Sequence, residues 1–296
     1  MPAGARTAVK KALLGAACLG LLVAVSAQAA AADRSCVERK ARNGESSPYV
    51  LSHGHRTPYS IVLIHGLSDS PYYTRALGQV FYDHGWNVVG ILLSGHGTTP
   101  SDLIHVALGD WEKDAACGYR AAAELGHRVA IGGFSTGGAL AIEAALAPGQ
   151  YPLAGLFLFS PALDFHDWKA GYACLLKYVR TYDGDHPEDS DIRYRRIALN
   201  AICELKRLMD AIGHADRAGE IAVPTFIAYS AADLTVDPDS IARFARGLKA
   251  PHAAIEYPAA ERVPHSDVVR PETNPRYPAL GRAIGGFIDD HFLVGG

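Results

Sequence analysis

The chain has 296 residues, of which 49% are hydrophobic and 20% charged, and its formal net charge is −3. This length accommodates one large α/β domain or two small ones, and the composition excludes a wholly disordered chain and a multi-pass membrane protein. The near-neutral charge does not favour nucleic-acid binding, which usually needs a basic face, and five cysteines are too few for a disulfide scaffold of this size.

The first 29 residues have the pattern of a secretory signal peptide. Positive charges come first, at Arg6, Lys10 and Lys11. An apolar stretch at 12–25 follows, and Ala27 and Ala29 occupy the small-residue positions of a cleavage site. An uncleaved anchor is the alternative, although the run reaches the ~20 residues of a spanning helix only if polar residues are included. We expect cleavage after Ala29 and export, to the periplasm or the medium, without stable membrane insertion.

The mature domain would then span residues 30–296. Removing 29 of 296 residues leaves 267, and the loss of three positive charges takes the net charge from −3 to −6. In an oxidising compartment the four remaining cysteines could form two disulfide bonds, in any of three pairings. These cysteines are Cys36, Cys117, Cys174 and Cys203. We favour Cys174 with Cys203, because both lie in one insertion described below. Burial of unpaired cysteines as small hydrophobic residues is the alternative.

Strands and helices alternate along the rest of the chain. Short apolar runs predict strands at 60–64, 87–93, 129–132, 153–159, 224–229 and 253–257. Amphipathic or alanine-rich segments predict helices at 71–84, 110–125, 137–147, 238–248 and 278–293. For the first helix, Asp69 or Ser70 is available as N-cap, with Pro71 in the first turn. This alternation predicts βαβ units and a mostly parallel sheet flanked by helices.

Residues 164–219 interrupt the alternation. Two helix-like stretches, 170–180 and 193–212, flank a polar loop. Because a structureless loop of this length is improbable inside a compact domain, we predict a small helical cap inserted between two strands.

A strand–turn–helix motif carries the strongest chemical signal. The sequence Gly-Phe-Ser-Thr-Gly at 133–137 follows a predicted strand and precedes a predicted helix, as a nucleophile elbow requires. A sharp turn would place Ser135 in a strained conformation, so that Gly133 and Gly137 must lack side chains. The helix N-terminus would direct free amides toward the serine. A phosphate-binding loop is the competing interpretation, but its characteristic residues are absent.

A nucleophilic serine needs a base and an acid that orients the base. His265 lies after the last predicted strand, and Asp233 follows directly after the strand at 224–229. The order Ser135, Asp233, His265 is typical of α/β-hydrolases. Asp237, four residues further on, is the rival acid, and Asp267 follows His265 too closely to orient it.

The second expected feature is an oxyanion hole, which needs two N–H donors. Thr136 supplies one backbone amide, and the backbone amide of Leu67 after the first strand is the natural second. The Leu67 side chain would line an acyl pocket. We interpret the neighbouring His65 and the glycine-rich turn at 93–98 as structural.

Six segments occur in the order typical of one family: HGLSDSP, SGHGTTPSDL, DWEKDA, GFSTGG, AADLTVDP and PHSDVV. The chain resembles the α/β-hydrolase superfamily, in the branch of bacterial carboxylesterases, monoacylglycerol-lipase-like enzymes and the serine aminopeptidase S33 domain. The resemblance extends from about residue 65 to the C-terminus. It implies the α/β-hydrolase fold, the triad Ser135, Asp233 and His265, and oxyanion donors Leu67 and Thr136. The cysteine-bearing, acidic insertion departs from the family pattern.

We therefore expect an exported serine hydrolase that cleaves a small-molecule ester or lipid, with a short-to-medium acyl chain, through an acyl-serine intermediate. Such chemistry needs no metal and no organic cofactor, and we expect no nucleic-acid partner. A thioesterase or aminopeptidase with the same triad, or a non-catalytic binding protein on this scaffold, are the alternatives. The oligomeric state stays open. One group of side chains would either contact an acyl chain or pack against the main domain: Tyr172, Leu175, Leu176, Tyr178 and Val179.

Overall fold

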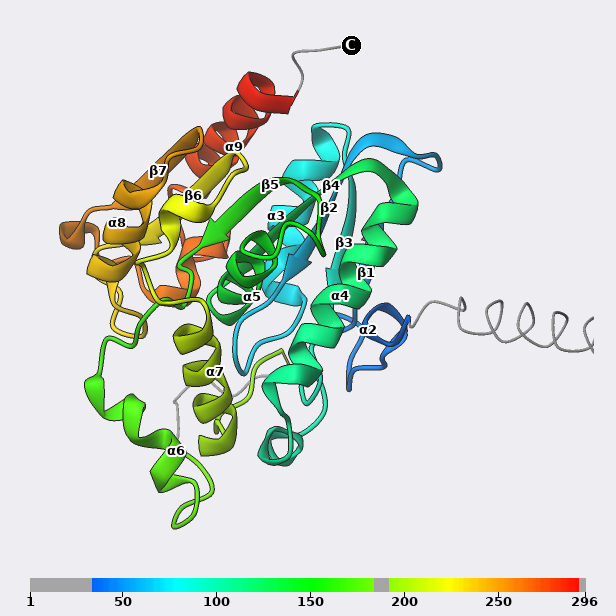
Figure 1. Ribbon diagram of the computed structural model, residues 1–296. Helices are drawn as coiled ribbons and strands as arrows, with labels where there is room; N and C mark the ends of the chain where they lie inside the picture. The colour runs from blue at the N-terminus through cyan, green and yellow to red at the C-terminus, as the bar shows by residue number, and fades with distance from the viewer. Residues whose placement is uncertain (1–33, 184–191, 293–296) are drawn as a thin grey trace, which may run out of the picture. The chain divides into compact units, whose positions relative to one another are not determined.

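The computed structural model describes residues 34–183 and 192–292. The predicted signal peptide lies outside the described residues. The described chain is built on a seven-stranded sheet of order β1-β3-β2-β4-β5-β6-β7, in which β1 is antiparallel to β3 and the other pairs are parallel (Figure 1). The strands are β1 (Tyr49–Leu51), β2 (Thr57–Ile64), β3 (Asn87–Ile91), β4 (Gly126–Phe134), β5 (Leu153–Phe159), β6 (Thr225–Ser230) and β7 (His252–Tyr257).

Helices cover both faces of the sheet. One face packs against α3 (Tyr72–Asp83) and α9 (Tyr277–Phe292), and the other packs against α4 (Leu108–Leu125), α5 (Thr136–Ala145) and α8 (Pro238–Gly247). Alternate residues of each central strand serve the two cores: Val62 and Ile64 pack toward α4 and α5, whereas Ile61 and Leu63 pack toward α3 and α9. Burial on both faces explains the continuous apolar runs that predicted these strands.

The sequence analysis does not predict two short elements and predicts a third as a longer helix than the structure contains. A single-turn helix, α2 (Ser35–Glu38), and the edge strand β1 lack a strong periodic signal. The predicted helix at 170–180 is instead a 3₁₀ turn, η2 (Trp168–Tyr172), and one helical turn, α6 (Ala173–Leu176). Only Ala173 of α6 is buried, so little tertiary packing supports a longer helix.

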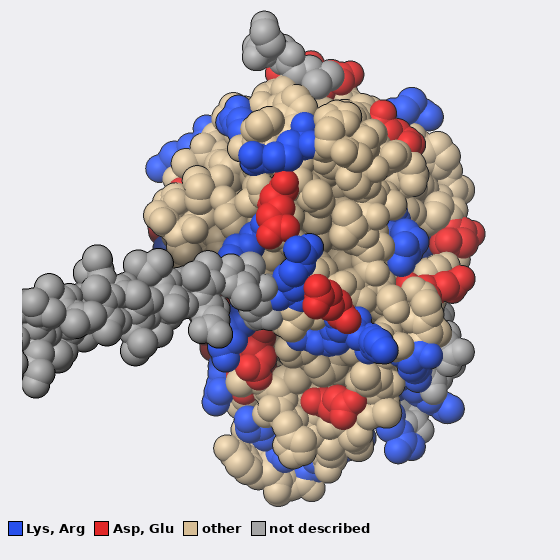
Figure 2. Space-filling view, turned by 90° about the vertical axis from the view of Figure 1, so that its right-hand side faces the viewer, with Lys and Arg blue, Asp and Glu red and all other residues tan. Residues whose placement is uncertain are grey.

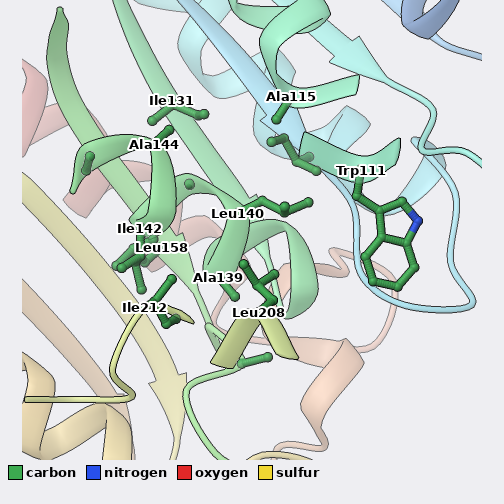
Figure 3. Packing of buried hydrophobic residues seen from close by; sticks show 14 of the residues in the cluster. Trp111, Ala115, Ile131, Ala139, Leu140, Ile142, Ala144, Leu158, Leu208 and Ile212 are labelled. Atoms are coloured by element: carbon green, nitrogen blue, oxygen red, sulfur yellow. The ribbon is translucent and has the colours of Figure 1, made fainter. Parts of the chain in front are cut away.

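The insertion leaves the sheet after β5 and returns before β6. Besides η2 and α6 it contains α7 (Leu199–Ala211), which lies beyond the strand ends (Figure 1). Figure 3 shows Leu208 beside Ala139 of α5 and Ile212 near Ile142 and Leu158. The insertion is therefore attached to the helix that begins at the predicted nucleophile.

Two disulfide bonds tie remote segments together. Cys174 pairs with Cys203 and joins α6 to α7, as the sequence predicted. Cys36 pairs with Cys117, which links α2 to α4 across 81 positions of sequence. The alternative of unpaired buried cysteines is therefore wrong for these four residues.

Charge is mixed on the side of the molecule drawn in Figure 2, where basic and acidic side chains are interspersed. Among the helices described for this chain, none is long and apolar enough to cross a membrane.

Candidate active site

The sheet reverses its winding direction at β2. From β2 the chain moves outward to β3 and then returns to the other side of β2 to form β4. A crevice opens outside the carboxyl ends of parallel strands at such a point. Ile64 at the end of β2 pairs with Gly133 near the end of β4. The loop 65–70, here called the oxyanion loop, therefore leaves the sheet beside the turn that carries Ser135.

Ser135 occupies a strained turn between β4 and α5. Its φ of 53° and ψ of −115° lie outside the conformations that side chains readily adopt. A Cβ atom on Gly137 would collide with the Ile64 carbonyl, and one on Gly133 would collide with the backbone of Gly137. The steric reason for both glycines is thus visible in the structure. The Ser135 amide donates to the Phe159 carbonyl at 3.0 Å, which holds the turn against β5.

Asp233 and His265 meet at the carboxyl edge of the sheet. His265 begins the 3₁₀ turn η5 (His265–Val269), and its Nδ1 lies 2.5 Å from Asp233 Oδ2. The other carboxylate oxygen accepts hydrogen bonds from the amides of Thr235 and Val236, at 2.8 and 3.1 Å. The Asp233 side chain is fully buried. Because an ionised carboxylate can only accept, the imidazole carries its proton on Nδ1, and Nε2 is left with a free lone pair.

The His265 ring packs against the turn of Ser135. Its centroid lies 4.7 Å from that of Phe134, the residue immediately before Ser135. His265 Nε2 is buried and has no hydrogen-bond partner among the residues described. The Ser135 hydroxyl is therefore not hydrogen-bonded to it in this state, as is common for catalytic contacts before substrate binds.

The two other predicted carboxylates are engaged elsewhere. Asp237 is the N-cap of α8 and accepts from the amides of Asp239 and Ser240, both at 3.1 Å. Asp267 lies 3.8 Å from Arg270 in an ion pair. The structure thus brings His265 to Asp233 and to neither of the alternatives.

The two amides predicted to bind an oxyanion are both available. Thr136 is the first residue of α5, where an N–H has no partner within the helix. The Leu67 amide donates to no acceptor within the described chain. The Leu67 side chain packs against buried residues of the insertion, here called the cap cluster: Ala173, Leu199, Ile202 and Cys203.

Two buried histidines support the oxyanion loop. His65 Nε2 accepts from the Leu93 amide at 3.1 Å, and His96 Nε2 accepts from the Ser68 amide at 3.3 Å. Burial lowers the pKa of His96 to about 4 and that of His65 well below its ordinary value. Both rings are therefore neutral near pH 7, which each needs in order to accept a hydrogen bond. The structural interpretation of His65 agrees with these contacts.

Comparison with known proteins agrees with this fold. Residues 56–182 match the family model described as serine aminopeptidase, S33. Two metagenome-derived lipolytic enzymes, LipS and LipT, are the subject of a solved structure that is 21% identical, with a TM-score of 0.71 over 84% of this chain and 99% of the other. The chain has the α/β-hydrolase fold.

Other relatives of this α/β-hydrolase act on lipids according to their names. A thermostable monoacylglycerol lipase from Bacillus sp. (strain H-257) is 26% identical over 199 residues, which cover 65% of this chain and 76% of the relative. A solved structure of a monoglyceride lipase variant from Saccharomyces cerevisiae has a TM-score of 0.65 at 13% identity, covering 82% of this chain and 92% of the other. At these identities the structures show the shared fold.

The sequence analysis missed the contact of one buried carboxylate near the candidate site. Asp69 does not cap α3, because Pro71 occupies the N-cap position and the Asp69 side chain faces inward. Its Oδ1 lies 3.4 Å from Arg193 Nε of the insertion. Burial raises the pKa of Asp69 to about 6, while electrostatic interactions with Arg193, His265 and Arg270 oppose this rise. No local pattern links Asp69 to Arg193, since 124 positions separate them.

The apolar side chains predicted on the insertion face solvent. Tyr178 and Val179 are 80% and 82% exposed, and Leu175 is 69% exposed. Of the two alternatives for this group, packing against the main domain is therefore wrong for these three residues.

Metal ligands do not gather in this α/β-hydrolase. Within residues 34–183 and 192–292, no three His, Cys, Asp or Glu side chains converge closely enough to hold a metal ion. The expectation that the reaction needs no metal or organic cofactor stays a prediction.

Proposed function

We propose that this α/β-hydrolase is an exported serine hydrolase that cleaves carboxylic esters through an acyl-serine intermediate. One observation carries the proposal: His265 is oriented by buried Asp233 and packs beside the strained turn of Ser135. A serine without an oriented base is a weak nucleophile, and a binding protein would not need this arrangement.

The first half of the reaction transfers the acyl group to the enzyme. His265 Nε2 takes the proton of Ser135 as the serine oxygen attacks the ester carbonyl carbon. The carbonyl oxygen becomes an anion and accepts hydrogen bonds from the amides of Leu67 and Thr136. When the carbon–oxygen bond of the ester breaks, His265 gives its proton to the leaving alcohol. Throughout, Asp233 stabilises the charged imidazole.

The second half regenerates the enzyme. Water occupies the place of the departed alcohol and loses a proton to His265 as it attacks the acyl-serine. Collapse of the second tetrahedral intermediate returns that proton to Ser135 and releases the carboxylic acid. The same residues act in both halves, so that loss of one of them stops turnover.

An ester with a short-to-medium acyl chain is the substrate class that we propose. The named relatives are lipases and other lipolytic enzymes, which supports an ester bond over an amide. Because the matching family model is described as serine aminopeptidase, hydrolysis of an amide bond is the alternative to test. Comparing p-nitrophenyl esters with p-nitroanilides and acyl thioesters separates these classes.

Export is supported by the two disulfide bonds, since such bonds form and persist in oxidising compartments. Expression of the full chain in a bacterium, followed by N-terminal sequencing of the periplasmic and secreted fractions, tests this part. The proposal expects a mature protein that begins at Ala30. A cytoplasmic protein that retains Met1 would contradict it.

The catalytic part is tested by hydrolysis of p-nitrophenyl esters of increasing chain length. Ser135→Ala is expected to lower kcat by about 10⁴–10⁶-fold, because the triad acts as a unit. Ser101→Ala, at an exposed serine, is the matched control and should retain full activity. Hydrolysis that is unaffected by Ser135→Ala would refute the mechanism, and rates that rise steadily to the longest chains would refute the substrate class.

A further inference from the structure

Ser68 in the oxyanion loop has a backbone conformation that needs external support. Its φ of 65° is in the left-handed region, which residues other than glycine seldom adopt. Both of its backbone groups are held: the amide donates to His96 Nε2 at 3.3 Å, and the carbonyl accepts from the Tyr194 amide at 2.8 Å. Tyr194 belongs to the insertion, so the conformation of the loop depends on a segment outside the sheet.

The residues on either side of Ser68 also contact the insertion. Leu67 places its side chain against the cap cluster, and Asp69 lies 3.4 Å from Arg193. The Asp69 side chain is only 4% exposed and that of Arg193 is 22% exposed, so that solvent screens their attraction weakly. Three consecutive loop residues are thus held by the insertion through an apolar contact, a hydrogen bond and an ion pair.

Tyr194 contributes a second attachment through its side chain. The hydroxyl donates to the Gly95 carbonyl at 3.1 Å and accepts from the Thr98 amide at 2.8 Å. Its ring stacks near that of His96, with an angle of 8° between the planes. The loop that carries His96 and the oxyanion loop are therefore both fastened to Tyr194 of the insertion.

We propose that Arg193 is a positioning residue that acts through Asp69 to hold the Leu67 amide in its oxyanion-binding geometry. The proposal rests on the proposed function, because the role of the Leu67 amide is part of it. Arg193 would not touch the substrate. Its loss would let the loop relax from the strained Ser68 conformation, which moves the amide that stabilises the transition state.

Kinetics of three variants separate this role from a general effect on folding. Arg193→Met should lower kcat by about tenfold to a hundredfold, as expected when a catalytic group shifts by about 1 Å, and should leave KM within about twofold. Arg193→Lys keeps the charge and should retain kcat within about threefold. Arg195→Met, at an exposed arginine two positions away, is the matched control and should match the wild type.

A double-mutant cycle tests whether Arg193 acts through Asp69. The losses of kcat caused by Asp69→Asn and by Arg193→Met should not be additive. The double variant should therefore be about as active as the less active of the two single variants. Because the charge of Asp69 affects the site only through Arg193 in this proposal, the part of the acid limb of kcat that the Asp69 carboxylate sets should disappear in Arg193→Met. Arg193→Lys should not move that limb.

Hydrogen exchange supplies a readout that is independent of activity. Peptides covering residues 65–70 should exchange faster in Arg193→Met than in Arg195→Met, whereas peptides from α9 should not differ. A kcat for Arg193→Met equal to that of Arg195→Met, a loss that appears in KM alone, or unchanged exchange at 65–70 would overturn the proposal. If the wild type hydrolyses no ester, the proposed function fails, and the exchange comparison still decides whether the ion pair holds the loop.

Discussion

At the scale of single residues, Ser135 depends on the absence of side chains around it. Gly137 lies against the Ile64 carbonyl and Gly133 against the first turn of α5. The same tight turn ends β4 and begins α5 at Thr136, whose amide is the predicted oxyanion donor. The two glycines therefore allow both the close packing of this turn and the placement of Ser135 and Thr136 for catalysis.

Gly137→Ala should displace the turn, because the new methyl group would collide with backbone that cannot rotate away. We expect loss of ester hydrolysis and a decrease in the free energy of unfolding of at least about 2 kcal/mol. Gly286→Ala in α9 is the matched control, since a methyl group there meets nothing within 4 Å. It should stabilise the protein slightly. Chemical denaturation and activity assays of both variants check this, and an active Gly137→Ala protein of normal stability would count against the packing argument.

Asp233 and Asp237 provide a direct comparison between two aspartates of one loop. Asp233→Asn should lower kcat by about 10³–10⁴-fold, because an amide no longer enforces the Nδ1–H tautomer of His265. Asp237→Asn should retain activity, since asparagine also caps helices well. Equal activity of the two variants would mean that Asp233 does not orient the base.

Residue positions could be predicted from the sequence where the residues that define them are adjacent in the chain. The turn around Ser135 is local, and so is the position of Asp233 just after β6. The contact of Asp69 with Arg193 joins two segments 124 positions apart, and no periodicity reports such a contact. Local pattern offered Asp69 or Ser70 as the N-cap of α3, and both are wrong because Pro71 holds that position.

At the scale of elements, the first helix of the insertion is shorter, and its apolar side chains more exposed, than the sequence suggested, because little of it packs against the rest of the chain. Its first helical stretch is rich in apolar residues, yet α6 ends at Leu176 and the following Tyr178 and Val179 are exposed. Short helices gain most of their stability from packing, and here only Ala173 is buried. The central strands, buried on both faces, were predicted within a few residues of their ends because burial itself produced their apolar runs.

The disulfide bond in the insertion should affect the site through the cap cluster. Replacing Cys174 and Cys203 by alanine removes the link between α6 and α7, next to the side chain of Leu67. We expect kcat to fall by about threefold to tenfold, because a loosened support misplaces the Leu67 amide. Unchanged kcat in this double variant would show that the cap cluster keeps its structure without the bond. Steady-state kinetics at 25 °C measure the effect.

At the scale of the whole molecule, the bond between Cys36 and Cys117 closes the larger loop. Restricting the unfolded chain across 81 positions should contribute about 4 kcal/mol to stability. Replacing both cysteines by serine should lower Tm by roughly 10 °C for a domain of this size and leave kcat at 25 °C unchanged. Calorimetry with and without reductant measures the change, and a shift below about 2 °C would contradict the expectation.

Acid should destabilise the protein through His96. Its pKa is lowered from 6.5 to about 4 by burial, so the unfolded chain binds a proton more readily than the folded one between these values. Stability that is present above pH 6.5 is therefore lost progressively toward pH 4, by about 3 kcal/mol in total. Because Asp69 and Glu143, with pKa values raised to about 6 and about 7, act in the opposite direction, the wild type must be compared with His96→Gln. The difference in unfolding free energy between the two should shrink as the pH falls from 6.5 to 4, and a constant difference would refute this role of His96.

Covalent labelling of Ser135 tests the central claim most directly. Diethyl p-nitrophenyl phosphate should phosphorylate the serine oxygen and release p-nitrophenolate, and peptide mass spectrometry should find one diethylphosphoryl group on the peptide that contains Ser135. Ester hydrolysis should fall in proportion to the labelled fraction, and Ser135→Ala should take up no label. Label on a different residue, or full ester hydrolysis by a completely labelled protein, would contradict the acyl-serine mechanism.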